Sequence, residues 1–291
     1  MRDPKDIRKS VSKSYTRAVE KAPAEARSCC AGTAPKGIAA ALAGYSREAL
    51  ASLPADAVAN SFGCGNPVAL AEIREGDTVL DLGSGAGIDL LLAAKLTGPT
   101  GRVIGVDMTM AMIERARANA EAAGLANVEV REGIIEDLPV EPGSVDLVIS
   151  NCVINLSPEK PRVFSEIARV LKPGGRFSIS DMVVEDMPAW VREIGLLYSA
   201  CVAGAIPEAD YLLGLRRAGL VDVAVRDRLV YDRDHLSGLL QSELADGEGC
   251  GCGCAGKSPI VAEGIEAAID SVAGKVASIR VVGRKPEEVI Q

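Results

Sequence analysis

The segment Thr78-Val79-Leu80-Asp81-Leu82-Gly83-Ser84-Gly85-Ala86-Gly87 decides the fold of this 291-residue chain. A short β-rich run ends in glycines, and a helical run from Gly87 to Leu96 follows at once. Glycines let the backbone turn sharply and approach a bound ligand closely. Asp107 ends the next predicted strand about twenty residues further on, where an acidic side chain can accept hydrogen bonds from both hydroxyls of a ribose. The segment therefore predicts a strand, a ligand-binding turn and a helix.

The rest of the chain alternates predicted strands and helices. Strands are expected over 102–107, 128–131, 144–150 and 176–183, and helices over 109–123 and 158–171. This order implies an α/β fold with a Rossmann-like, mostly parallel sheet and helices on both faces. After Pro188 the pattern weakens, with helices expected near 189–200 and 207–218, strands near 221–231 and 277–283, and an irregular Gly/Cys-rich stretch at 246–256.

We expect three regions along the chain. Residues 1–67 form an Ala-rich N-terminal helical segment that caps the next domain and is interrupted at prolines. Residues 68–187 form the ligand-binding sheet domain. Residues 188–291 form a smaller C-terminal α+β region that acts as a lid.

Composition excludes several classes of partner. The formal net charge is −8, from 40 acidic and 32 basic residues, which disfavours binding to nucleic acid or to anionic membrane surfaces. The N-terminus lacks an apolar signal segment, and no apolar run reaches the roughly 18 residues of a membrane helix. We therefore expect a cytoplasmic protein whose eight cysteines stay reduced and serve metal or metalloid ligation, redox chemistry or packing. With His235 as the single histidine, Cys–His or Ser–His catalysis is nearly excluded.

Two motifs together resemble the class I methyltransferases that use S-adenosylmethionine (SAM). These are D-L-G-S-G-A-G at 81–87 and L-K-P-G-G-R at 171–176. The resemblance implies that Asp81, Gly83, Ser84 and Gly85 lie along the methionine and ribose of SAM. It implies that Asp107 holds the ribose hydroxyls and that Met108 lies beside the adenine. It also implies that Ile135 and Glu136 line the adenine pocket and that Asn151 faces the methionine end.

The cysteines stand in sequence contexts that point to the methyl acceptor. S-C-C surrounds Cys29 and Cys30, F-G-C-G-N-P surrounds Cys64, S-N-C-V-I-N-L-S surrounds Cys152 and C-V-A-G-A-I begins at Cys201. In this order the motifs resemble those of bacterial arsenite methyltransferases, from about residue 15 to about residue 285. Most other class I methyltransferases lack a cysteine in the S-N-C-V-I-N-L-S element.

The resemblance implies a substrate and a mechanism. Trivalent arsenic is a soft acid that prefers thiolate sulfur, so Cys64, Cys152 and Cys201 would hold arsenite or methylarsenite. The arsenic lone pair would attack the methyl group of SAM, and S-adenosylhomocysteine would leave. No general base is needed because arsenic carries no proton. Between methylations, Cys29 or Cys30 would form a disulfide with Cys64, and thioredoxin or glutathione would restore the thiols.

Other interpretations remain open at this point. Cys250, Cys252 and Cys254 form a Gly-spaced tract that either captures arsenite or another soft metal, serves thiol exchange, or is an exposed loop with incidental thiols. A SAM-dependent enzyme acting on a small organic acceptor would need an aromatic-lined pocket, which 3% aromatic residues disfavours. A non-catalytic thiol-rich protein that sequesters metalloid would not need the glycine loop and Asp107.

Overall fold

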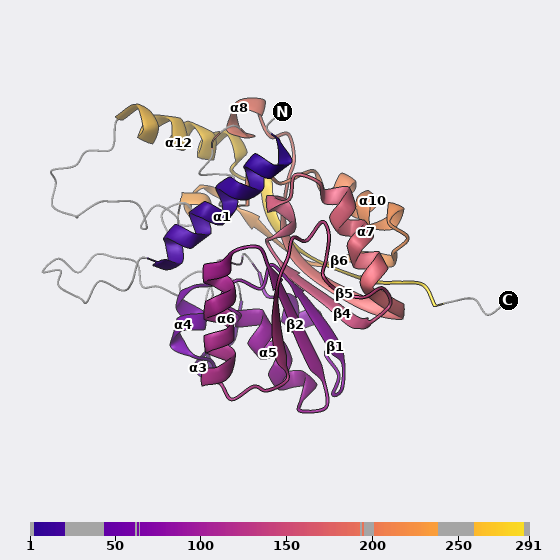
Figure 1. Ribbon diagram of the computed structural model, residues 1–291. Coiled ribbons are helices and arrows are strands. Elements are labelled where there is room, and N and C mark those ends of the chain that lie inside the picture. The colour runs from indigo at the N-terminus through magenta and orange to yellow at the C-terminus, as the bar shows by residue number, and fades with distance from the viewer. Residues whose placement is uncertain are drawn as a thin grey trace, which may run out of the picture.

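The computed structural model describes residues 3–20, 44–61, 63, 65–192, 194, 201–237 and 259–287. These residues include a seven-stranded sheet in the order β3-β2-β1-β4-β5-β7-β6 (Figure 1). The strands are β1 (Thr78–Leu82), β2 (Arg102–Asp107), β3 (Val128–Glu132), β4 (Val145–Asn151), β5 (Leu171–Val184), β6 (Val221–Tyr231) and β7 (Val276–Arg284). Strands β1 to β5 pair in parallel, and β7 runs antiparallel to both β5 and β6. The strand order reverses beside β1, where β4 follows on the side opposite β2, and such switch points bind ligands in open α/β sheets.

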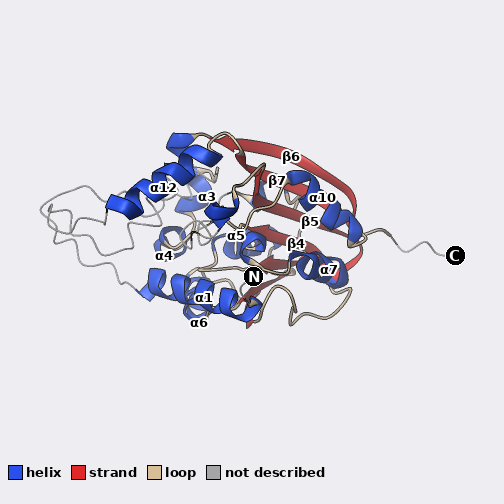
Figure 2. Cartoon of the chain, turned by 90° about the horizontal axis from the view of Figure 1, so that it is seen from above, coloured by secondary structure: helices blue, strands red, loops and turns tan. Residues whose placement is uncertain are grey.

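Helices cover both faces of the sheet (Figure 2). Helices α5 (Ile88–Thr97) and α6 (Met110–Ala122) bury Leu90 and Ile113 against one face. Helices α7 (Lys160–Val170) and α10 (Glu208–Arg217) cover the other face. There the rings of Phe164 and Tyr211 meet edge to face, with centroids 5.2 Å apart. Helices thus pack against both faces of the sheet through apolar side chains. A ligand can therefore reach the sheet at the ends of the strands.

Further helices complete the described fold, some of them at the carboxyl ends of the parallel strands. They are α1 (Pro4–Glu20), α3 (Arg47–Ala51), α4 (Ala55–Ala59), η1 (Pro67–Leu70), η2 (Ile154–Leu156), α8 (Ala189–Arg192) and α12 (Pro259–Val272). Helix α1 lies across this end of the sheet beside α6 (Figures 1 and 2). The N-terminal segment therefore approaches the place where a ligand is expected.

The predicted fold class is confirmed, with two differences in the elements. β5 begins at Leu171, ahead of the predicted residue 176, because Leu171 already pairs with Val145 before the ladder shifts register. Helix α12 was not predicted, although it buries Ala268, Ile269 and Val272 at helical spacing. Of the helix expected near 189–200, α8 forms the first part, and most of the remainder lies outside the described residues.

The C-terminal region contributes β6 and β7 to the same sheet as residues 68–187. The division into three regions stays a prediction.

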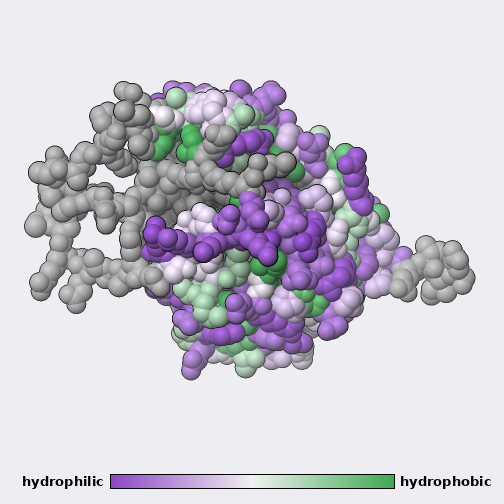
Figure 3. Space-filling model, turned by 45° about the horizontal axis from the view of Figure 1, so that its top comes forward, coloured by the Kyte–Doolittle hydropathy of each residue, from purple (hydrophilic) through white to green (hydrophobic). Residues whose placement is uncertain are grey.

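The surface seen in Figure 3 is largely hydrophilic, with apolar residues in small separate patches. Among the helices that the structure describes, none combines the length and apolar character needed to cross a membrane.

Candidate cofactor and cysteine site

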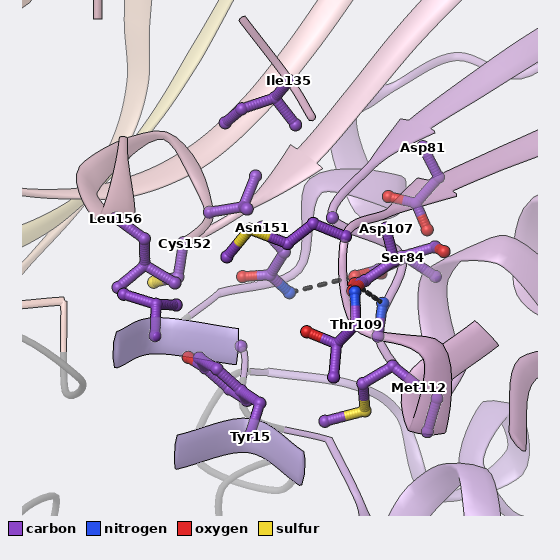
Figure 4. Close-up of a pocket in the computed structure, with 18 of the residues that line it drawn as sticks. Tyr15, Asp81, Ser84, Asp107, Thr109, Met112, Ile135, Asn151, Cys152 and Leu156 are labelled. Atoms are coloured by element: carbon purple, nitrogen blue, oxygen red, sulfur yellow. Dashed lines mark hydrogen bonds between the residues drawn. The ribbon is translucent and has the colours of Figure 1, made fainter. Parts of the chain in front are cut away.

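A cavity opens at the carboxyl ends of β1, β2 and β4, at the switch point of the sheet (Figure 4). The loops after β1, β2, β3 and β4 form its walls, and α1 contributes to its lining. All nine residues predicted to bind the cofactor line this cavity: Asp81, Gly83, Ser84, Gly85, Asp107, Met108, Ile135, Glu136 and Asn151. The sequence motifs therefore converge on one place, and their individual contacts with a ligand stay predictions.

The carboxylate of Asp107 is fixed by two backbone amides. The N–H of Gly85 donates to Oδ2 at 3.0 Å, and the N–H of Thr109 donates to Oδ1 at 2.8 Å. Burial raises the pKa of Asp107, while these hydrogen bonds oppose the rise. Each carboxylate oxygen has two lone pairs, so both oxygens can still accept from the hydroxyls of a ribose.

Asp81 presents a buried carboxyl group to the same cavity. Its side chain is 2% exposed, and Oδ2 has no hydrogen-bond partner among the described residues. Burial, followed by the nearby charges of Asp89 and Asp107, raises the pKa of Asp81 well above its usual range. An unsatisfied buried carboxyl is costly, and a cationic ligand group would relieve that cost. The buried carboxyl of Asp81 therefore fits a ligand with cationic groups, such as the sulfonium and ammonium groups of SAM.

The glycines of the loop after β1 make room for this cavity. Gly83 has a φ of +63°, and a side chain there would collide with Val153. Gly85 has a φ of +52°. Both positions adopt the left-handed conformation that glycine accepts without strain. The predicted close approach of the backbone is thus explained by the local geometry.

Asn151, at the end of β4, clamps the chain on both sides of residue 64. Its Nδ2 donates to the carbonyl of Gly65 at 2.7 Å, and its Oδ1 accepts from the N–H of Gly65 at 3.2 Å. A side chain at Gly63 would collide with the amide of Asn151. A Cβ at Gly65 would lie 2.7 Å from the Cβ of Ser180. Glycine is therefore required at both positions by close packing.

Sequence reasoning missed a buried polar network that supports this clamp. The hydroxyl of Tyr45 donates to Asp89 Oδ1 at 2.7 Å, and Asn151 Nδ2 donates to Asp89 Oδ2 at 3.0 Å. Burial raises the pKa of Asp89 to about 6, and the two hydrogen bonds limit the rise. Asp89 lies in the first turn of α5, so the network joins the start of this helix, through Asn151, to Gly65.

The structure brings Cys152 and Cys201 together. Both are buried, at 3% and 4% exposure, and both belong to the same apolar cluster. The thiol of Cys201 donates to the backbone carbonyl of Cys152, with 2.9 Å between Sγ and O. Cys152 lines the cavity and Figure 4 shows it beside Leu156. Two sulfur-bearing residues from distant segments thus meet next to the predicted cofactor site.

Both cysteines have an uncommon backbone conformation. The φ angles are +59° at Cys152 and +62° at Cys201, in the left-handed region that non-glycine residues seldom adopt. Such strain persists only where the surroundings fix it, and it clusters at functional sites.

One expectation about the thiols needs correction. Cys152 is disulfide-bonded in this structure, so not all eight cysteines are thiols, whereas Cys201 carries a buried thiol. Cys29, Cys30, Cys64, Cys250, Cys252 and Cys254 lie outside the described residues. Within the described ranges, no group of three or more His, Cys, Asp or Glu side chains is arranged to hold a metal ion.

Helix α1 supplies cavity residues that no local motif indicated. Arg8, Val11 and Tyr15 line the cavity, and Tyr15 reaches it from α1 in Figure 4. Arg8 Nη1 lies 3.1 Å from both Glu136 Oε1 and Glu159 Oε2. The available signal was the spacing of Ile7, Val11 and Tyr15, which places all three on one face of a helix.

Comparisons with known proteins agree with this geometry. The family model described as "Methyltransferase domain" matches residues 73–242. An arsenite methyltransferase from Halobacterium salinarum is 50% identical over 187 residues, which are 63% of this chain and 48% of the relative. One from Aquipseudomonas alcaligenes is 39% identical over 203 residues, 67% of this chain and 57% of the relative. The chain spans about half the length of these curated relatives.

A solved structure gives the same result. The crystal structure of an arsenic(III) S-adenosylmethionine methyltransferase from Chlamydomonas reinhardtii is 36% identical, with a TM-score of 0.64, covering 84% of this chain and 75% of that one. The chain therefore belongs to the methyltransferase-domain family and, among its members, to the arsenite methyltransferases.

Proposed function

We propose that this chain is an enzyme that transfers a methyl group from SAM to trivalent arsenic held by its cysteine thiolates. The observation that carries the proposal is the position of Cys152, which lines the cavity and whose carbonyl accepts from the thiol of Cys201. Thiolate sulfur suits the soft As(III) centre. Arsenite and methylarsenite are the proposed acceptors.

The residues around the cavity would hold SAM in a defined way. Asp107, oriented by Gly85 and Thr109, would accept from the ribose hydroxyls. The unsatisfied oxygen of Asp81 would face a cationic part of the methionine. When bound, SAM would supply an electrophilic methyl group to the arsenic lone pair, with S-adenosylhomocysteine as the leaving group and no proton to remove. The residues of this chain thus act by binding and orienting the reactants.

Cys64 is the proposed third arsenic ligand. The support comes from its neighbours, because Gly63 packs on Asn151 and Gly65 exchanges two hydrogen bonds with it. Asn151 directly precedes Cys152. Gly63 and Gly65, the two chain neighbours of Cys64, thus lie against the residue that precedes Cys152, which supports the proposal of a shared arsenic atom.

A thiol reductant completes the proposed cycle. Methylation leaves arsenic formally pentavalent, and two cysteine thiolates would return it to the trivalent state by giving up two electrons and forming a disulfide. Cys29 or Cys30 with Cys64 is the proposed pair, and thioredoxin or glutathione would reduce that disulfide by thiol exchange. The disulfide at Cys152 supports the need for a reductant, because a disulfide sulfur is not a thiolate ligand.

The test is transfer of a labelled methyl group. Reduced protein is incubated with methyl-labelled SAM and arsenite, with either glutathione or thioredoxin and its reductase, and arsenicals are separated by chromatography. We expect labelled methylarsenicals that require both protein and arsenite. Stoichiometric arsenite binding without labelled product would instead identify a sequestering protein, and label on an organic acceptor alone would identify a different transferase.

A further inference from the structure

A buried carboxylate on β5 lies outside the cavity and has no part in the proposed transfer. Asp181 is 0% exposed. It accepts hydrogen bonds from the hydroxyl of Tyr211 at 3.0 Å and from the N–H of Met182 at 2.9 Å. Removing a carboxylate from water is costly unless it is well paired. These two donors come from β5 itself and from α10.

The loop that carries Cys152 is fastened to this stretch of β5. The N–H of Cys152 donates to the carbonyl of Ser180 at 2.8 Å. Asn155 is fully buried, and its Nδ2 donates to the carbonyl of Met182 at 2.6 Å. Asp181 lies between these two anchors in the strand, and its Oδ1 accepts from the N–H of Met182. Ser180 and Met182 of β5 thus hold the loop of Cys152 at two points.

The segment that carries Cys201 is fastened to the next residues of the same strand. Val183 forms a parallel bridge with Ile206, and the N–H of Val184 donates to the carbonyl of Ile206 at 3.2 Å. Helix α10 begins two residues later, at Glu208, and supplies Tyr211. The Cys201 segment is therefore held on β5 through Ile206 and, one helical turn further on, through the hydroxyl of Tyr211.

We propose that Asp181 is a positioning residue for the arsenic-binding cysteines. Its carboxylate accepts from Tyr211, in the segment after Cys201, and from the N–H of Met182, whose carbonyl anchors Asn155 in the loop of Cys152. This inference rests on the proposed function. Asp181 acts on the two segments and is not proposed as an arsenic ligand. It fixes the separation of the two segments, and so the geometry that Cys152 and Cys201 offer to one arsenic atom.

The experiment compares Asp181→Asn and Tyr211→Phe with wild type. Asparagine keeps the size of the side chain and loses one acceptor oxygen, and phenylalanine removes only the donating hydroxyl. Thr97→Val is the matched control. Thr97 is fully buried, and its Oγ1 donates to the carbonyl of Ala94 at 3.2 Å in α5. Thr97 is far from the cysteines in sequence and does not line the cavity. Each protein is measured for KM and kcat with arsenite, for arsenite affinity and for affinity to S-adenosylhomocysteine.

We expect Asp181→Asn and Tyr211→Phe to weaken arsenite affinity roughly tenfold, as for the loss of a buried hydrogen bond, with S-adenosylhomocysteine affinity within about twofold of wild type. Thr97→Val should change neither. In a Cys152→Ser background the Tyr211→Phe change should add no further loss, because the geometry it protects is gone.

The positioning role would be overturned if Tyr211→Phe kept wild-type arsenite affinity. It would also be overturned if that variant lost affinity for arsenite and for S-adenosylhomocysteine to the same extent. The same loss in the Cys152→Ser background would also overturn it. If wild-type protein itself neither binds nor methylates arsenite, the proposed function fails, and this inference fails with it. Tyr211→Phe keeps the test decisive if Asp181→Asn does not fold.

Discussion

The Sγ atom of Cys201 lies 2.9 Å from the carbonyl oxygen of Cys152 and donates a hydrogen bond to it. These residues are 49 positions apart, and the fold brings them together beside the cavity that follows β1, β2 and β4. Because the two residues are in contact, replacement of either one should change the affinity for the same proposed arsenic atom.

Replacement of Cys201 separates ligation from hydrogen bonding. Serine keeps a donor to the carbonyl of Cys152, whereas alanine removes it. If sulfur is the arsenic ligand, Cys201→Ser and Cys201→Ala should both lose at least about tenfold in arsenite affinity, a loss typical of damaged metal sites. Isothermal titration calorimetry measures the affinity. Full affinity in the serine variant alone would mean that Cys201 acts only by holding the loop of Cys152.

The disulfide at Cys152 predicts a redox requirement. Oxidised protein should not bind arsenite at this site, because the thiolate is the form that binds soft metals. Treatment with a thiol reductant should restore binding, while affinity for S-adenosylhomocysteine should be the same before and after. Arsenite binding of equal strength in the untreated oxidised protein would exclude Cys152 as a ligand.

Replacement of Asp107 should affect the cofactor and leave arsenic binding unchanged. Asp107→Ala removes the acceptor of the Gly85 and Thr109 amides together with the proposed partner of the ribose. Hydrogen bonds to a charged group contribute about 1.5–3 kcal/mol, so SAM affinity should fall by roughly one to two orders of magnitude. Arsenite affinity of the reduced variant serves as the control. An unchanged SAM affinity would place the ribose elsewhere.

The buried carboxyl of Asp181 should make stability depend on pH. Burial raises the pKa of Asp181 to about 7, whereas the unfolded chain releases this proton near its usual pKa of about 4. The folded state therefore binds the extra proton below pH 7, and its stability falls as pH rises through 7. Between pH 5.5 and 8 the wild type should lose about 2 kcal/mol relative to Asp181→Asn. Urea unfolding of both proteins at both pH values measures this, and parallel profiles would contradict the shift.

Much of the fold could be predicted because local signals were strong. The glycine loop at Gly83 and Gly85 and the alternation that follows gave the parallel strands, since buried parallel strands are continuous apolar runs. Leu171 was missed as the start of β5 because the predicted turn after it lies within the strand ladder. Helix α12 was missed although its apolar spacing was readable.

The site was less predictable where it depends on contacts between distant segments. Cys152 and Cys201 could be singled out by their sequence contexts, but their contact through a carbonyl could not. Tyr45 and Asp89 carry no motif, and their link to Asn151 arises only when three elements meet. Arg8 likewise reaches Glu136 from a helix 128 residues away. Such networks have no periodic signal in the sequence.

The most direct measurement compares arsenite methylation by reduced wild type and Cys152→Ser, with S-adenosylhomocysteine affinity measured on the same samples. The account predicts that wild type produces methylated arsenic and that the methylation rate of the variant is lower by at least about a hundredfold, because transition-state positioning is removed. It predicts equal affinity for S-adenosylhomocysteine in the two proteins. Near wild-type methylation by Cys152→Ser would contradict it.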